Sequence, residues 1–279
     1  MIEVGKINKL TVTKVVDFGV FLDAQDLGNI LLIKGLCPKN IEVGDSIDVF
    51  LYYDTEDELV ATTKTPLAQV GDFAVLKIVG ISNVGAFADI GLEKDLLIPF
   101  SEQRVHLEED RIYLFYLYLD KASGRLCGTM KFNRILDKEP ADYQVGEEVQ
   151  LIVAEKSDMG IKMIINNTHW GLLFKTEILG NLFIGKRLKG YIRRIREDGK
   201  IDLSLQKVGK EKEEDLSSRI LSALSRCNGF IPLSDKSAPE AIFKEFRTSK
   251  ATYKRTIGHL YKQNKIRIDK AGIYLIKED

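Results

Sequence analysis

The chain has 279 residues, of which 44% are hydrophobic and 29% charged, and its 41 basic and 41 acidic side chains balance. This length exceeds what one hydrophobic core usually organises, so two to four domains are expected. There is no apolar run of about 18 residues and no signal-peptide core, which argues against a membrane span or export. Three dispersed cysteines, Cys37, Cys127 and Cys227, argue against a disulfide framework and a zinc site. These features predict a cytoplasmic protein.

The net charge changes sign along the chain. Residues 1–67 carry 6 basic and 11 acidic side chains, net −5, and residues 68–143 carry 9 and 12, net −3. Residues 144–210 carry 12 and 8, and residues 211–279 carry 14 and 10, so each of these segments is net +4. The capacity to bind a polyanion is therefore expected in the C-terminal half.

A glycine spacing repeats three times in the first three quarters of the chain. An opening glycine is followed fourteen residues later by a second glycine, and a third landmark comes after fourteen more. The three sets are Gly5, Gly19 and Ile33; Gly71, Gly85 and Pro99; and Gly146, Gly160 and Phe174. Each set lies among short strand-like runs bounded by Gly, Asp and Asn, as in small all-β domains. The middle glycine is predicted to allow the sharp bend that closes a barrel of about five strands.

The last quarter of the chain has a helical pattern. Residues 210–226 place Leu216, Ile220, Leu221 and Leu224 on one face. Residues 235–246 predict a second helix with a Ser237–Glu240 capping box and Pro239 in its first turn. Residues 249–265 predict a third helix, with Ser249 as N-cap and with Tyr253, Ile257, Leu260 and Tyr261 facing inward. Residues 266–276 read as a β-hairpin, and three helices plus a hairpin resemble a winged-helix domain.

The repeated units resemble a known domain family. The stretches "DFGVFLD", "GLLFKTE" and the closing "IDLSL" (201–205) are similar to parts of the S1 RNA-binding domain, an OB-fold barrel. The expected fold is multidomain and mainly β: three tandem S1-like OB-fold barrels followed by a C-terminal α+β winged-helix domain. The boundaries are predicted at 1–66, 67–140, 141–210 and 211–279.

The whole arrangement resembles the bacterial conserved virulence factor B family. That resemblance implies a cytoplasmic RNA-binding regulator of gene expression, including virulence genes, rather than an enzyme, and it implies no cofactor. In S1 domains the bases stack on two aromatics of an F-G-x-F motif and on a histidine. No unit here keeps that full set, which puts base stacking in doubt. The residues at the matching positions are Phe18, Phe21 and Ile33; Val84, Phe87 and Pro99; and Met159, Lys162 and Phe174.

The strongest basic pattern lies in "KRLKGYIRRIR" of the third unit. Strand alternation puts Leu188 and Ile192 on one face and puts Arg187, Lys189, Tyr191 and Arg193 on the other. Cations around an aromatic ring suit a single-strand groove, and Arg194 and Arg196 follow near a turn. On the third helix of the winged-helix domain, Lys250, Lys254, Arg255 and Lys262 lie on or beside an outward stripe. We therefore expect the third unit and the winged helix to bind single-stranded RNA. The two acidic units are expected to be spacers, a partner surface or weak accessory sites.

Signals for catalysis are weak. "GNLFIGKR" nearly matches a phosphate-binding loop, but Arg187 stands where a hydroxyl is needed. His106, His169 and His259 are scattered without clustered ligands. Two other functions stay open: a DNA-binding transcription regulator that reads duplex with Thr252, Lys254, Arg255 or Gln263, and a scaffold on the ribosome or a ribonuclease complex. No membrane partner is expected.

Overall fold

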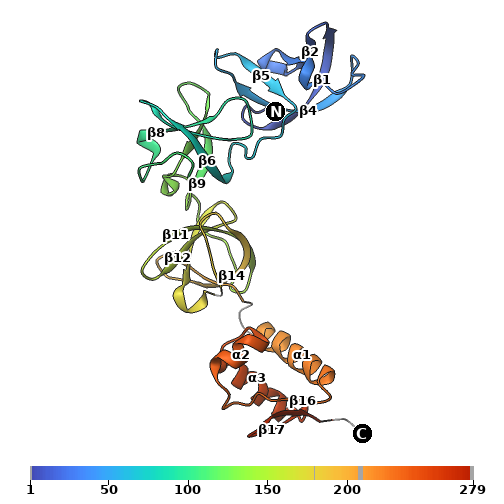
Figure 1. The fold of residues 1–279 in the computed structure, drawn as a ribbon, viewed down its shortest axis with the longest axis vertical. Coiled ribbons are helices and arrows are strands. Elements are labelled where there is room, and N and C mark those ends of the chain that lie inside the picture. The colour runs from blue at the N-terminus through green and yellow to red at the C-terminus, as the bar shows by residue number, and fades with distance from the viewer. Residues whose placement is uncertain (1, 179, 207–209, 277–279) are drawn as a thin grey trace. The chain divides into compact units, whose positions relative to one another are not determined.

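A computed structural model describes residues 2–178, 180–206 and 210–276, and it describes side chains throughout these ranges except at 210–215. The chain is mainly β, with three small five-stranded barrels and a C-terminal winged-helix domain, which confirms the predicted fold class (Figure 1). It divides into two compact units, residues 1–141 with 150–188 and residues 142–149 with 189–279, so the third barrel contributes strands to both. The four domain boundaries stay a prediction. Within the described residues, no helix is both long and apolar enough to span a membrane.

The first barrel is a curved sheet in the order β3-β2-β1-β4-β5, and its edge strands β3 and β5 lie side by side. Alternate side chains of these strands point inward, and Leu10, Leu22, Leu32 and Leu51 form much of its buried core. Its strands are β1 (Ile7–Val16), β2 (Gly19–Asp23), β3 (Asn29–Ile33), β4 (Ser46–Tyr53) and β5 (Leu59–Thr62), with the 3-10 turns η1 (Gln25–Leu27) and η2 (Lys34–Leu36).

The second and third barrels close fully, in the orders β10-β8-β7-β6-β9 and β11-β12-β13-β15-β14. The second contains β6 (Phe73–Ile81), β7 (Gly85–Ala88), β8 (Leu96–Pro99), η3 (Phe100–Glu102), β9 (Ile112–Leu119), β10 (Leu126–Thr129) and then η4 (Phe132–Arg134). The third contains β11 (Glu148–Lys156), β12 (Gly160–Ile165), β13 (His169–Phe174), η5 (Lys175–Glu177), β14 (Arg187–Ile195) and β15 (Ile201–Ser204). A 3-10 turn follows the third strand of every barrel, so the three copies share detail beyond their strands.

The middle glycine of each repeat lies at a close crossing of two strands. Gly19 faces Ile33, Gly85 faces Pro99, and Gly160 faces Phe174 in the antiparallel pairings. A Cβ added at these glycines would lie 2.2, 2.3 and 2.1 Å from the carbonyl oxygens of Leu32, Ile98 and Leu173. The first strand of each barrel also carries a register shift, the local irregularity that helps a sheet to coil. The fourteen-residue spacing therefore places a glycine where two neighbouring strands come too close for any Cβ atom.

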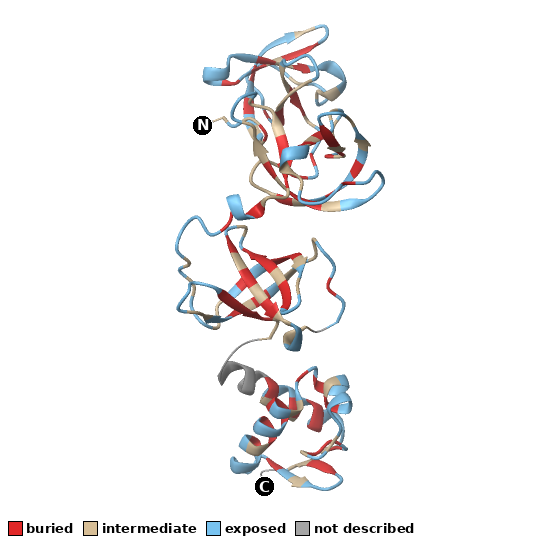
Figure 2. Cartoon of the chain, turned by 90° about the vertical axis from the view of Figure 1, so that its left-hand side faces the viewer, coloured by how far each residue is buried: buried red, intermediate tan, exposed pale blue. Residues whose placement is uncertain are grey.

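The winged-helix domain packs three helices over a small sheet of order β16-β18-β17. Its core contains the predicted Leu216, Ile220, Leu224, Tyr253 and Ile257. Figure 2 shows buried segments on the helices of this domain. The elements are α1 (Lys210–Arg226), β16 (Phe230–Ile231), α2 (Pro239–Phe246), α3 (Lys250–Lys262), β17 (Ile266–Asp269) and β18 (Gly272–Leu275).

Two local predictions in this domain are wrong and one is confirmed. Helix α2 has Ala238 as N-cap without a side-chain cap, because the Ser237 hydroxyl accepts a hydrogen bond from the Ser234 amide instead. Tyr261 is 55% exposed, since it falls at the C-terminal end of α3, beyond the core. Ser249 does cap α3, accepting a hydrogen bond from the Thr252 amide at 3.2 Å.

The second barrel is joined to the strands of the third that share its compact unit. Phe73, Phe132, Ile152 and Ile164 belong to one buried cluster built from both barrels. The Trp170 indole packs on this cluster and donates to Asn133 Oδ1 at 2.9 Å. A hydrophobic core shared by two domains limits their relative motion more than a polar contact does.

Replacing Gly85 with alanine is expected to lower the free energy of unfolding by about 1–3 kcal/mol, because the new methyl group would overlap the Ile98 carbonyl. Gly80→Ala is the matched control on the same hairpin, since a Cβ there meets no atom within 4 Å. Differential scanning calorimetry of the full chain measures both. Equal transition temperatures for the two variants would contradict the close-crossing argument.

Candidate nucleic-acid interface

Strand β14 carries the predicted basic face. Lys189 and Arg193 are exposed, Tyr191 is half-buried, and Gly190 and Ile192 point into the barrel. The pairing with β15 shifts register between Ile192 and Arg194, so the alternation ends there and Arg194 is exposed as well. The bulge therefore places two neighbouring arginines on the surface, which strict alternation does not predict.

Glu148 on β11 organises the centre of this face. Its Oε1 lies 2.6 Å from the Lys189 Nζ, and its Oε2 accepts a hydrogen bond from the Tyr191 hydroxyl at 3.3 Å. The hydrogen bond from Lys189 to this carboxylate raises the lysine pKa. Because both charged side chains are largely exposed, water screens the pair and a phosphate can compete for the ammonium.

Two other predicted cations of the third barrel are engaged within the protein. Arg187 Nη2 donates to the backbone carbonyl of Phe73 in the second barrel at 2.5 Å. Arg196 binds the Asp202 carboxylate through Nε at 3.0 Å and Nη2 at 2.6 Å, and Asp202 is only 8% exposed. The hydrogen bond to Asp202 raises the pKa of Arg196. The side chains of both arginines therefore make hydrogen bonds within the protein.

Lys162 and Phe174 lie on other strands of the third barrel. The Lys162 ammonium stands 4.7 Å from the Trp170 ring centroid and 3.9 Å from the Glu155 carboxylate. Trp170 in turn contacts the second barrel, so Lys162 lies beside that joint. Phe174 ends β13 opposite Gly160 and is half-buried.

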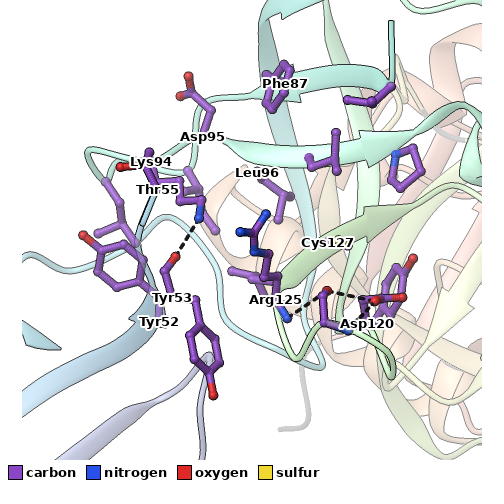
Figure 3. Close-up of a pocket in the computed structure, with 18 of the residues that line it drawn as sticks. Tyr52, Tyr53, Thr55, Phe87, Lys94, Asp95, Leu96, Asp120, Arg125 and Cys127 are labelled. Atoms are coloured by element: carbon purple, nitrogen blue, oxygen red, sulfur yellow. Dashed lines mark hydrogen bonds between the residues drawn. The ribbon is translucent and has the colours of Figure 1, made fainter. Parts of the chain in front are cut away.

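The residues that precede the close-crossing glycines are exposed in every barrel. These residues are Phe18, Val84 and Met159, at 60%, 54% and 62%. Phe21 in β2 and Phe87 in β7 come two positions after the close-crossing glycines and are half-buried. Phe87 lines a pocket of about 760 Å³ to which Tyr52 and Tyr53 of the first barrel contribute (Figure 3).

In the winged-helix domain the outward stripe of α3 is partly engaged. The Lys250 ammonium donates to the Lys236 carbonyl at 3.4 Å, and Lys254 lies 3.8 Å from Asp235. Arg255 and Lys262 are exposed, whereas Thr252 is buried.

A hollow of about 550 Å³ lies beside the C-terminal end of α3. Lys262 and Tyr261 line it together with Arg267 and Tyr274. The Arg267 guanidinium stands 4.7 Å from the centroid of the Tyr274 ring. Exposed aromatic rings with neighbouring cations are the composition that binds single strands.

The net charge has opposite sign in the two compact units. Residues 142–149 and 189–279 contain 21 basic and 16 acidic side chains, net +5, and the other unit contains 20 and 25, net −5. Lys189, Arg193, Arg194 and the cations of α3 all belong to the positive unit. The field of this unit therefore attracts polyanions.

Glu148 and Trp170 are not among the candidates predicted from the sequence for these surfaces, and Tyr261 is predicted to lie in the core. Glu148 could have been found, because closing the barrel places β11 beside β14 and brings opposite charges together. Trp170 and Tyr261 carry no local signal, since their positions depend on where a neighbouring barrel or a helix end lies.

Comparisons with known proteins define the class first. Residues 4–64 match the S1 domain family, and residues 218–275 match the CvfB-like winged helix domain family. The protein is thus a multidomain chain that contains an S1 domain and a CvfB-like winged helix domain.

Relatives that match nearly the whole chain define the class of protein more narrowly. The chain is 28% identical to YitL of Bacillus subtilis (strain 168) over 267 residues, covering 92% of this chain and 88% of that protein. It is 25% identical to conserved virulence factor B of Staphylococcus aureus (strain USA300) over 279 residues, covering 92% and 93%. A solved multidomain protein with nucleic acid binding domains from Streptococcus pneumoniae aligns with a TM-score of 0.41 at 24% identity, covering 98% of each chain. The predicted resemblance to the conserved virulence factor B family is confirmed.

Lys162→Ala is expected to alter the fluorescence of Trp170, the sole tryptophan, because it removes the cation above the ring. The affinity for labelled single-stranded RNA is expected to stay within about twofold, as for an ordinary surface substitution. Lys156→Ala, an exposed lysine of the same barrel, serves as the control for emission. A large loss of RNA affinity in Lys162→Ala, with no loss in Lys156→Ala, would show that Lys162 takes part in RNA binding.

Proposed function

We propose that the protein is a non-catalytic, cytoplasmic RNA-binding regulator that acts on gene expression after transcription. Single-stranded RNA binds to β14 of the third barrel and to the winged-helix domain. The observation that carries the proposal is the cluster of exposed Lys189, Arg193 and Arg194 around Tyr191 on one strand. The relatives named conserved virulence factor B support a link between this function and virulence.

The geometry of β14 suits a backbone track. Phosphates pair with Lys189, Arg193 and Arg194, and Lys189 exchanges Glu148 for a phosphate oxygen as RNA binds. Tyr191 and the half-buried Phe174 are two aromatic side chains of this barrel that can be offered to bases. Each base stacked on an aromatic ring contributes roughly 1–3 kcal/mol, so one or two such contacts matter beside the charges.

The winged-helix domain favours unpaired bases over duplex. Thr252 is buried and Lys254 lies close to Asp235, which reduces the side chains able to read base edges in a major groove. Tyr261 instead presents an exposed ring, next to Lys262, at the hollow beside the C-terminal end of α3. A ring next to a cation recognises a splayed base and its phosphate.

Replacing Lys189, Arg193 and Arg194 with alanine is expected to weaken binding of single-stranded RNA and to flatten its salt dependence. Each lost phosphate contact removes about 0.7 from the slope of log K against log salt for a single strand. Fluorescence anisotropy of the full chain with labelled RNA across a salt series measures the slope. The control replaces three exposed lysines of the first barrel, Lys9, Lys14 and Lys39, and is expected to keep the wild-type slope. Equal slopes in both triple variants would rule out β14 as the RNA track.

The same assay with single-stranded RNA, single-stranded DNA and duplex DNA tests the class of nucleic acid. Preference for single-stranded RNA supports the proposal. Preference for duplex DNA would make the winged helix a transcription-factor reader. Failure to bind any of the three would overturn the proposed function.

Tyr261→Ala is expected to lower RNA affinity by about fivefold or more, because one stacking ring is lost. Tyr261→Phe keeps the ring and is expected to retain most of the affinity. Because this side chain is exposed, both variants are expected to fold, and circular dichroism checks it. If the alanine and phenylalanine variants bind alike, Tyr261 does not stack on RNA.

A further inference from the structure

A deep hollow lies where the first two barrels meet. It has a volume of about 760 Å³, within the range of about 300–1,000 Å³ that encloses ligand-sized groups. Figure 3 shows Tyr52, Tyr53 and Thr55 reaching it from the first barrel, opposite Phe87, Leu96 and Cys127 of the second. Both barrels belong to the negatively charged unit.

Polar contacts between the barrels hold the walls of the hollow in place. The Lys94 ammonium donates to the backbone carbonyls of Tyr53 and Asp54, and Arg125 pairs with Asp57. Away from the hollow, the Ile7 amide donates to Gln69 Oε1 at 2.8 Å. The site is therefore preformed, which lowers the entropic cost of binding a ligand.

The cations of the lining are already engaged, whereas one carboxylate is not. Besides Lys94 and Arg125, the lining contains four carboxylates, those of Glu93, Asp95, Glu102 and Asp120. Among the described residues, no hydrogen bond or ion pair holds the exposed Asp95 carboxylate. Glu93 pairs with the exposed Lys64 at 3.1 Å. The hollow thus offers acceptors for a cation, and both cations among its described lining residues, Lys94 and Arg125, are already engaged.

The titration of the lining groups agrees with a negative potential. Partial burial raises the pKa of Asp95, and the neighbouring Asp89 raises it further. Burial, followed by the nearby Cys127, Glu102 and Asp120, raises the pKa of Tyr118 to about 12. An RNA backbone entering this hollow would meet repulsion, although Phe87 occupies a position at which S1 domains stack bases.

We propose that this hollow binds a basic segment of a protein partner, with a lysine or arginine side chain seated against Phe87 and the tyrosines and paired with Asp95 and Glu93. Long cationic side chains pack their stems on apolar and aromatic surface while the charged head meets a carboxylate. Charge complementarity favours such a segment, because the first two barrels carry net charges of −5 and −3 over residues 1–67 and 68–143. The inference is independent of the proposed RNA surface, whose cations Lys189, Arg193 and Arg194 belong to the other unit.

The test uses the full chain and a fluorescein-labelled heptapeptide of sequence GRGKGRG, with GEGDGEG as the acidic comparison. Anisotropy is expected to show binding of the basic peptide only, weakening as ionic strength rises from about 0.05 M to about 0.2 M. Phe87→Ala is expected to weaken the peptide about threefold through loss of the cation–ring contact. Asp95→Asn is expected to weaken it by a similar factor, about twofold to fivefold for a partly exposed ion pair.

Matched controls lie outside the lining. Phe100→Ala removes an exposed phenylalanine of the same barrel, and Asp48→Asn removes an exposed carboxylate of the first barrel. Both are expected to keep wild-type peptide affinity.

Three results would overturn the inference. The first is no binding of GRGKGRG, and the second is an equal loss in the control variants, which would assign binding to the acidic surface in general. The third is that Phe87→Ala and Asp95→Asn change binding of labelled single-stranded RNA but not of the peptide, which would make the hollow a base-binding site. Because Asp95 is exposed, its variant tests the site even if Phe87→Ala unfolds.

Discussion

Each barrel depends on one close backbone crossing. At Gly19, Gly85 and Gly160 a neighbouring carbonyl oxygen occupies the space that any Cβ would need. The crossing bends the second strand and fixes where it meets the third, so the residue before the glycine is pushed to the surface in all three copies. The positions available for ligand contact are therefore set by a steric requirement of the backbone, and evolution can change only the side chains that stand there.

The three copies use those positions differently. The first presents two phenylalanines on an acidic barrel, and the second turns its Phe87 into a shared hollow. The third has lost most of the aromatic set but carries cations along β14. The same barrel scaffold thus carries two kinds of surface within one chain. The first two barrels form an acidic hollow with aromatic walls, and the third carries a row of cations along β14.

Local patterns in the sequence predict the strands, the closing glycines and the three helices well, because each follows from short-range spacing. Alternation also predicts the exposed side of β14 as far as Ile192, and it stops working at the bulge before Arg194. The engagement of Arg187 could not be predicted, since its acceptor on Phe73 is 114 residues away in the chain. Tyr261 was assigned to the core because helical spacing alone does not say where the core ends. Failures of this kind concern partners and boundaries, whereas the elements themselves are specified locally.

The ion pair of Glu148 with Lys189 has a kinetic consequence for a strand held on β14. In the proposed RNA complex the carboxylate stays within reach of the ammonium, so it can pair with the lysine again whenever a phosphate moves away. An acceptor built into the track shortens the dwell time of each contact and lets the strand exchange or shift register without full dissociation. Under the proposed function, such a surface suits brief contacts with many RNA molecules better than permanent binding of one.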